Sequence, residues 1–146
     1  MAYATVRDCI DRRGAEGLRE LADDPNAPAA EFAWTRLEKA LDDASDEIDS
    51  YIGARHALPL DPVPRLLARL CVEIGIGIRA AEADRGTEMR RKRYEDAIRL
   101  LKDIEAGKAS LGAQDPDPPA EAASGGAPRF AQASPARQFG RDRGLL

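Results

Sequence analysis

The sequence has few of the residues that most often carry chemistry. It contains two cysteines, one histidine and one tryptophan among 146 residues, and aromatic residues make up 5% of it. Cys9 and Cys71 are far apart and lack metal-ligand spacing, so we expect reduced thiols buried on helices. A zinc site would need further histidines or a cysteine pair. We therefore expect neither a bound metal nor a cofactor.

Long hydrophobic runs are also missing. No apolar stretch approaches the ~18 residues of a membrane-spanning helix. The first residues, MAYATVRDCI, lack the charged and then apolar pattern of a signal peptide. The net charge of -4 is mild and does not call for nucleic acid as a partner. We expect a protein with no membrane contact that stays in the cytoplasm unless another machine carries it out.

Large apolar side chains are concentrated in residues 1–111, and residues 112–146 have very few of them. The second segment holds half of the chain's ten prolines and is rich in glycine and alanine. The first segment can bury a core and the second cannot. The sequence predicts a helical domain over residues 1–111 and an extended C-terminal tail over residues 112–146.

The apolar spacing within residues 1–111 predicts an all-α bundle of about five helices, two short and three long. A short helix between Thr5 and Gly14 is followed by a short piece around residues 18–21. Long helices are expected within residues 29–55, after the prolines from about residue 64, and over residues 87–107. The expected inward stripes are Trp34, Leu37, Leu41, Ala44, Ile48 and Tyr51; Leu67, Leu70, Cys71, Ile74 and Ile78; and Tyr94, Ala97, Leu101 and Ile104.

One stretch, EIGIGIRA, gives conflicting signals. Its alternation of isoleucine and glycine is typical of a strand, and each glycine inside a helix costs about 1 kcal/mol relative to alanine. The flanking residues have helical spacing, however, and no second strand is available for pairing. We expect a helix in which Gly75 and Gly77 let another helix, either of this chain or of a neighbouring subunit, approach closely.

The only histidine lies beside Tyr51 and Arg55, and two interpretations of this group are possible. Nucleophilic catalysis would need a serine or cysteine oriented by His56, and Ser50 projects away from it on a helix. The alternative is a helix end at Arg55 and His56, followed by an elbow made rigid by Pro59, Pro62 and Pro64. We favour the helix end and expect no enzymatic activity.

Two charged runs remain. The acidic residues of LDDASDEID have helical spacing without the glycine turn of a calcium loop, so they predict a solvated face. The basic run Arg90, Arg91, Lys92 and Arg93 is a candidate charged contact for DNA or for protein. Four consecutive helical residues point around most of the helix, and Glu88, Glu95 and Asp96 partly neutralise them. A small helical DNA-binding or regulatory protein remains an alternative on these residues.

Three stretches together resemble the Mu-type phage family of small helical head–tail connector proteins. They are MAYATVRDCIDRRG, LDDASDEIDSYIGARHALPLDPVPRLLARLCVEI and DRGTEMRRKRYEDAIRLLKDIEAGKASLG, and they cover residues 1–112 in order. His56 stands where an aromatic residue is common in the family, and GIGI replaces a more ordinary helical sequence. The resemblance does not extend to the tail.

The resemblance implies a structural protein of the virion, located at the head–tail junction after a stage in the host cytoplasm. It implies a ring, commonly of twelve subunits, that contacts the portal protein and a tail-side connector or terminator protein. DNA would pass through this ring without sequence-specific binding.

The tail itself contains candidate anchors for a protein interface. We expect it to order on assembly against a neighbouring subunit or the portal, because two phenylalanines are unusual in a purely solubilising segment; a plain flexible tail is the alternative. The candidate residues are Arg129, Phe130, Arg137, Phe139, Arg141, Arg143, Leu145 and Leu146.

Overall fold

The computed structural model describes residues 2–112, and these residues form an all-helical body without strands. The elements are α1 (Val6–Arg13), η1 (Glu16–Leu21), η2 (Ala29–Glu31), α2 (Thr35–Ile52), α3 (Arg65–Glu82) and α4 (Glu88–Glu105), where η denotes a 3₁₀-helix. The predicted all-α fold is confirmed: α1 and η1 are the two short helices, and α2, α3 and α4 are the three long ones. The single turn η2 is additional. The tail candidates at residues 129–146 lie outside the described residues.

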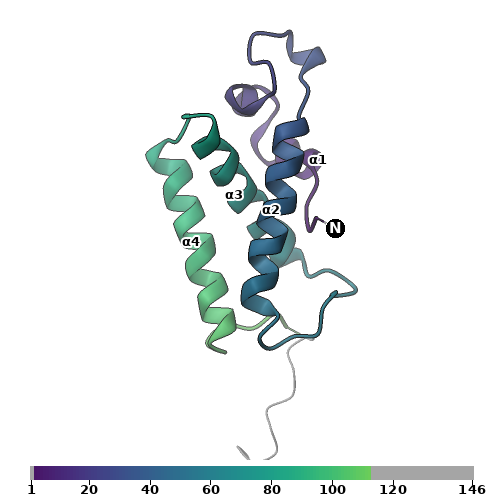
Figure 1. Cartoon of the computed structure of the whole chain (residues 1–146), viewed down its shortest axis with the longest axis vertical. Helices are drawn as coiled ribbons and strands as arrows, with labels where there is room; N and C mark the ends of the chain where they lie inside the picture. Colours follow the sequence, from purple (N-terminus) through teal and green to yellow (C-terminus); the bar gives the residue numbers. More distant parts are fainter. Residues whose placement is uncertain (1, 113–146) are drawn as a thin grey trace, which may run out of the picture. The chain divides into compact units, whose positions relative to one another are not determined.

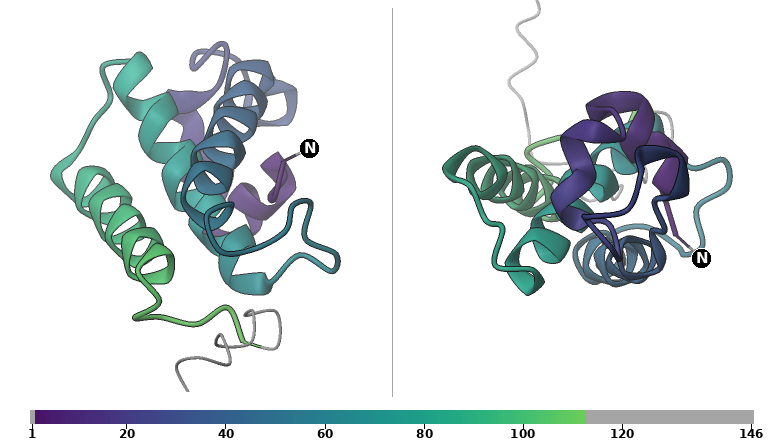
Figure 2. Two further views of the ribbon diagram at one scale, coloured as in Figure 1. Left: turned by 60° about the horizontal axis from the view of Figure 1, so that its bottom comes forward. Right: turned by 90° about the horizontal axis from the view of Figure 1, so that it is seen from above.

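Consecutive long helices run antiparallel, so α3 runs opposite to α2 and to α4, and α3 packs against both of them (Figures 1 and 2). The elbow that joins α2 to α3 lies at one end of this group, and the short turn that joins α3 to α4 lies at the other end (Figure 1). The segment that contains α1 and η1 packs on the α2–α3 pair.

The two glycines of α3 make this close packing possible on two sides. Successive helical residues are about 100° apart, so Gly75 and Gly77 point in nearly opposite directions. A Cβ atom at Gly75 would lie 2.6 Å from Leu41 Cδ2 of α2, and one at Gly77 would lie 2.9 Å from Tyr94 Cδ2 of α4. The helical interpretation of EIGIGIRA is therefore confirmed. Within the described body the closely approaching helices belong to the same chain, not to a neighbouring subunit.

Most of the predicted inward stripes are buried, but their ends differ from expectation. In α2, Leu37, Leu41, Ala44 and Ile48 are at most 1% exposed. Trp34 was expected inside; it is only half-buried, because it precedes the first turn of α2 and packs edge-on against Phe32 with ring centroids 5.6 Å apart. At the other end, Ile52 is fully buried and Tyr51 is half-buried.

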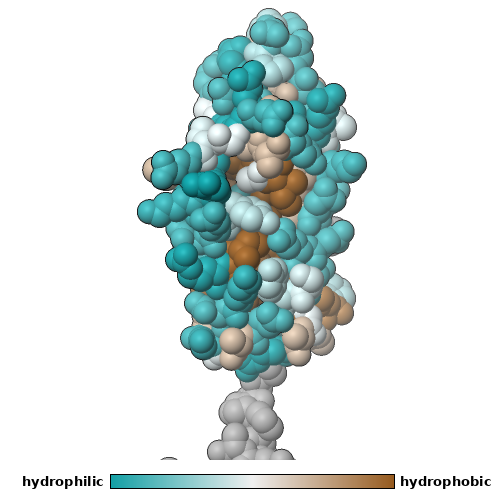
Figure 3. Space-filling view, turned by 60° about the vertical axis from the view of Figure 1, so that its left-hand side comes forward, coloured by the Kyte–Doolittle hydropathy of each residue, from teal (hydrophilic) through white to brown (hydrophobic). Residues whose placement is uncertain are grey.

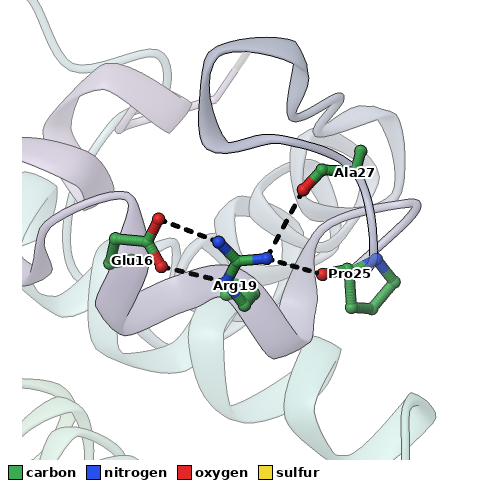
Figure 4. A network of polar contacts seen from close by, with 4 residues as sticks. All are labelled: Glu16, Arg19, Pro25 and Ala27. Atoms are coloured by element: carbon green, nitrogen blue, oxygen red, sulfur yellow. Dashed lines mark hydrogen bonds and ion pairs between the residues drawn. The ribbon is translucent and has the colours of Figure 1, made fainter.

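The loop between η1 and α2 is fixed by polar contacts of Arg19. Its guanidinium pairs with Glu16 at 2.9 Å and donates hydrogen bonds to the carbonyl oxygens of Pro25 and Ala27 (Figure 4). The same group lies 4.8 Å from the centre of the Phe32 ring. The loop is thereby folded back on η1, which brings Asp23 to the start of α2.

Asp23 caps α2 from a distant position in the sequence. Its carboxylate accepts hydrogen bonds from the backbone amides of Thr35 at 2.9 Å and Arg36 at 3.0 Å. These amides would otherwise be unpaired at the helix N-terminus. Burial raises the pKa of Asp23, but the hydrogen bonds from Arg36 and Thr35, together with the charge of Arg36, leave the pKa below its ordinary value.

The predicted local signals for helix ends are confirmed. The side chain of Thr5 accepts a hydrogen bond from the Asp8 amide, and the Asp8 carboxylate accepts one from the Thr5 amide in return. Thr87 caps α4 by accepting a hydrogen bond from the Arg90 amide at 3.1 Å. Gly14 ends α1 with a φ of 74°, and Gly107 follows the last turn of α4 with a φ of 76°. A residue with a side chain would be strained at either backbone angle.

A larger residue at Gly75 should destabilise the fold. Gly75→Val would place side-chain atoms in the space of Leu41, so we expect a loss of about 1–3 kcal/mol in the free energy of unfolding. Gly17→Ala is the matched control, because a Cβ at Gly17 meets nothing within 4 Å, and it should change stability by less than about 0.5 kcal/mol. Urea titration followed by circular dichroism measures both. Equal stability of the two variants would contradict the packing described for α3.

Removal of the Asp23 carboxylate should weaken the fold in a pH-dependent way. A carboxyl group with a lowered folded-state pKa stabilises the fold above its unfolded-state pKa, and this contribution is lost as the pH falls through the folded-state value. Asp23→Ala should therefore cost about 1 kcal/mol at pH 7. The difference from the wild type should shrink as the pH falls below about 4. Urea unfolding at several pH values tests this, and a difference that does not depend on pH would exclude the carboxylate as its cause.

Candidate interaction surface

Tyr51 lies in the last turn of α2, which ends at Ile52, earlier than the helix end predicted at Arg55 and His56; these two residues lie in the turn that follows. The His56 backbone amide donates a hydrogen bond to the Ile52 carbonyl oxygen at 2.9 Å, and His56 Nδ1 lies 3.3 Å from the same oxygen. The histidine is not at a frayed end, because only 7% of it is exposed. Arg55 extends along Gly107, where an added Cβ would lie 2.1 Å from its guanidinium. This geometry gives His56 a role in closing the last turn of α2.

Both cysteines are buried and free, as predicted. Cys9 lies on α1 and Cys71 on α3. Burial raises the pKa of the Cys9 thiol to about 12, and it also raises the pKa of Cys71. Cys71 Sγ lies 3.4 Å from Ser45 Oγ, which donates a hydrogen bond to the Leu41 carbonyl oxygen at 2.9 Å. The thiols are therefore protonated at neutral pH and act as small packing groups.

The acidic residues of α2 divide into a solvated set and a structural set. Asp42, Asp43 and Asp46 are exposed. Glu47 and Asp49 are half-buried and accept hydrogen bonds from the hydroxyls of Tyr94 and Tyr3, respectively. Burial, and then the charge of Glu47, raises the pKa of Tyr94, so its hydroxyl remains a donor at neutral pH. Among residues 2–112, no cluster of three or more histidine, cysteine or acidic side chains is arranged to hold a metal ion.

The basic run does not form one continuous positive face. Arg90 turns inward, where its guanidinium contacts Glu20 at 3.2 Å and the Arg85 carbonyl oxygen at 2.7 Å. Its neighbour Arg91 is exposed, 3.8 Å from Glu95.

Lys92 is also exposed, and Arg93 lines a cleft beside the Arg13–Glu73 ion pair. The structure therefore brings Arg90 and Arg93 toward the body and leaves Arg91 and Lys92 in solvent.

The elbow, which we define as residues 53–64, exposes apolar side chains that the sequence had not marked as functional. Leu58 is 40% exposed and Val63 is 42% exposed, although both are large aliphatic residues. Leu60 packs against the core and anchors the segment between them. Pro59, Pro62 and Pro64 restrict its backbone. The sequence ALPLDPVP did contain a signal for this exposure, because its apolar residues alternate with prolines and belong to no helical stripe.

A second apolar surface lies at the opposite end of α3. The α3–α4 groove, as we name it, has a volume of about 510 Å³. Its lining combines apolar residues with three charged ones: Gly77, Ile78, Ala80, Ala81, Gly86 and Tyr94, and Glu82, Arg90 and Arg91. Ile78 was expected in the core; it is half-buried and lines this groove instead. Figure 3 views the side of the molecule that carries α4 and shows hydrophobic surface between hydrophilic side chains. The sequence did not predict the groove, because the groove depends on how α3 and α4 lie against each other in space.

None of the helices within residues 2–112 combines the length and the apolar composition that a bilayer crossing requires.

Comparisons with known proteins show what the chain resembles. A family model described as Bacteriophage Mu, Gp36 matches residues 3–129. The chain is 38% identical over 123 residues to the Mu-like prophage FluMu protein gp36 of Haemophilus influenzae, with 84% of each chain covered. It is 33% identical over 114 residues to gene product J of Escherichia phage Mu, which covers 78% of this chain and 79% of that protein. The resemblance to a Mu-type phage family is confirmed, and the family match extends further into the C-terminal segment than residue 112.

Substitution of His56 should affect stability and not chemistry. His56→Ala removes the ring that lies against the Ile52 carbonyl oxygen in a buried position, so we expect a loss of about 1–3 kcal/mol in the free energy of unfolding. Arg55→Ala is the control for a neighbouring exposed position and should cost less. Urea unfolding measures the stability, and phage yield at a permissive temperature measures the function. A folded His56→Ala chain that abolishes phage production would indicate a direct functional contact of this residue.

Proposed function

The chain belongs to the Bacteriophage Mu, Gp36 family, and on this basis we propose that it is a structural protein of the phage particle that acts as a head–tail connector. In this role it bridges the portal protein of the head and the proteins at the start of the tail. The family membership supports the phage context. The connector role rests on the resemblance in sequence and on the surfaces of the folded body.

The observation that carries the proposal is the presence of apolar surface at two separate places on the described body. The elbow exposes Leu58 and Val63 at the start of α3, and the α3–α4 groove opens near its end. Exposed apolar surface of this kind marks contact sites for proteins. A body with contact surfaces at two ends suits a protein that joins two others, or that joins copies of itself.

A ring of subunits is the assembly that we propose. The number of subunits, twelve, is taken from the family resemblance. Copies of the chain, the portal protein and a tail-side connector or terminator protein are the proposed partners, and DNA passes through the ring without sequence-specific contacts. The exposed Asp42, Asp43 and Asp46 on α2 would repel the phosphate backbone if they faced the channel and so keep DNA free to move.

We propose no catalytic activity for this protein. The side chains most suited to catalysis have structural roles instead. The Cys9 and Cys71 thiols are buried with raised pKa values, and His56 Nδ1 lies beside the Ile52 carbonyl oxygen at the end of α2. Nor does a particular observation favour the DNA-binding alternative, because Arg90 is held by Glu20 and Arg91 lies beside Glu95. A DNA-binding protein would show affinity that falls by orders of magnitude between low and moderate salt.

The connector role predicts a specific location and a specific defect. In a phage that encodes this chain, a C-terminal epitope tag should label purified particles at the head–tail junction in immunogold electron microscopy. A nonsense mutation in its gene should yield filled heads and separate tails that do not join, and the chain supplied from a plasmid should restore joining. Normal infectious particles that lack the chain would overturn the proposal, as would a label elsewhere in the particle.

A further inference from the structure

We propose that the C-terminal segment, residues 129–146, of one copy of this chain docks in a pocket beside the elbow of a neighbouring copy. This inference rests on the proposed function for its setting, a ring of like subunits, and it names the surface that receives the segment. That surface lies within residues 2–112, and the segment lies outside the described residues.

The receiving surface is a mainly apolar pocket with one carboxylate. The elbow pocket, as we name it, has a volume of about 340 Å³, which is in the range of protein pockets that bind ligands. Its lining consists of six uncharged residues and one charged residue: Ala2, Tyr3, Leu58, Pro59, Leu60 and Val63, and Asp49. Leu58 and Val63 are two of the three most exposed large hydrophobic side chains within residues 2–112. The basic residues nearest to the elbow in sequence, Arg55 and Arg65, are not part of the lining.

The surroundings of the elbow pocket are acidic. Asp61 is exposed within the elbow. On α2, Asp42, Asp46 and Asp49 follow one another at steps of four and three, so they lie along one side of the helix and lead away from the pocket. Within residues 2–112, Asp42, Asp46 and Asp61 make no ion pair. Lys39 lies about one turn beyond Asp42, at the far end of this strip from the pocket. The pocket therefore suits an occupant that is apolar and positively charged.

The C-terminal segment has this chemistry. Residues 129–146 contain four arginines and one aspartate, together with two phenylalanines and two leucines. In an extended chain, alternate side chains point to the same side. From residue 137 to residue 145, this alternation places five side chains on one side, namely Arg137, Phe139, Arg141, Arg143 and Leu145. The aspartate, Asp142, falls on the other side. An extended segment would thus present an aromatic ring between arginines.

Distances along the two partners match. With Phe139 in the elbow pocket, the next two arginines of the segment lie roughly 7 and 13 Å further along an extended chain. Asp46 and Asp42 lie roughly 5 and 11 Å from Asp49 along the axis of α2. Two exposed ion pairs can therefore form beside the apolar contact. Such pairs contribute little affinity, so the apolar contact supplies the affinity and the charges supply the specificity.

The segment is long enough to reach a neighbouring copy. The described body ends at Gly112, at the end of the long-helix group that carries the elbow (Figure 1). Residues 113–136 lie between this point and Arg137, and they can span up to roughly 80 Å. The long helices measure roughly 27 Å. Pairing of two unlike surfaces repeats from copy to copy and forms a closed ring when the rotation closes.

The start of α4 is an alternative occupant within the described residues, and its charge fits less well. Met89 is 57% exposed, and Lys92 is exposed about one turn further on. However, Glu88 is exposed beside Met89, and Asp96 is exposed two turns along the same side of the helix. This surface would bring two carboxylates to an acidic pocket.

Photo-cross-linking from the aromatic anchor tests the contact. Full-length chain with a photoreactive benzoylphenylalanine in place of Phe139 keeps an aromatic ring at this position. It should be mixed at high concentration with isotopically heavy wild-type chain and irradiated, and the cross-linked peptides should be identified by mass spectrometry. We expect cross-links to heavy peptides that contain residues 2–3 or 58–63, because heavy peptides can only come from another copy. The matched control carries the photoreactive residue at Ala122, outside the docking segment, and should give only background.

Each outcome decides the contact. Cross-links that map elsewhere on the body, or to the elbow pocket no more than in the control, overturn it. Cross-links confined to light peptides overturn the contact between copies. A photoreactive residue at Met89 that labels the elbow pocket more strongly than the one at Phe139 favours the start of α4 and also overturns it. Because purified chain is used, these results are independent of the location of the chain in the phage particle, on which the connector role depends.

A charge exchange gives a second measurement. Asp46→Arg in the heavy chain and Arg141→Asp in the photoreactive chain should each lower the yield of the elbow cross-link by roughly two- to fivefold, as expected for an exposed ion pair. The two variants mixed together should regain most of the yield. Glu88→Arg in the heavy chain is the control, because Glu88 is exposed at the other end of the long-helix group, and it should leave the yield unchanged. Thermal melts show whether each variant is folded. A mixture of the two variants that yields no more than either alone would overturn the pairing of Asp46 with Arg141.

Discussion

The close approach of α3 to two neighbouring helices is the constraint on which the described body depends. Gly75 leaves room for Leu41 on one side and Gly77 leaves room for Tyr94 on the other, so α2 and α4 can both lie against the same helix. Each glycine weakens the helix itself by about 1 kcal/mol relative to alanine. The packing offsets this cost, because the long apolar stripes of three helices become buried together.

Charged and polar side chains then hold the smaller pieces on this group. Arg79 is 4% exposed and donates a hydrogen bond from Nε to the Leu21 carbonyl oxygen at 3.1 Å, which ties η1 to α3. Arg13 pairs with Glu73, and the Tyr94 hydroxyl reaches Glu47. Much of the charge in the described body thus serves internal contacts, and no extended field of one sign develops around the basic run.

These features are compatible with the role in assembly that we propose. A protein that joins larger structures needs a stiff body with contact sites at separate ends, and the antiparallel arrangement places the elbow and the α3–α4 groove in that relation.

The sequence by itself determined the helices, because their signals are local. Thr5, Thr87, Gly14 and Gly107 mark helix ends through contacts within a few residues, and the apolar spacing identifies most of the core. It also showed the family. Only the tertiary structure decided that Trp34 is half-buried, that Ile78 lines a groove, and that Asp23 caps a helix twelve residues away from it. Each of these depends on which distant segments meet, and a linear pattern does not contain that information, since spacing fixes the face of a helix but not its neighbour.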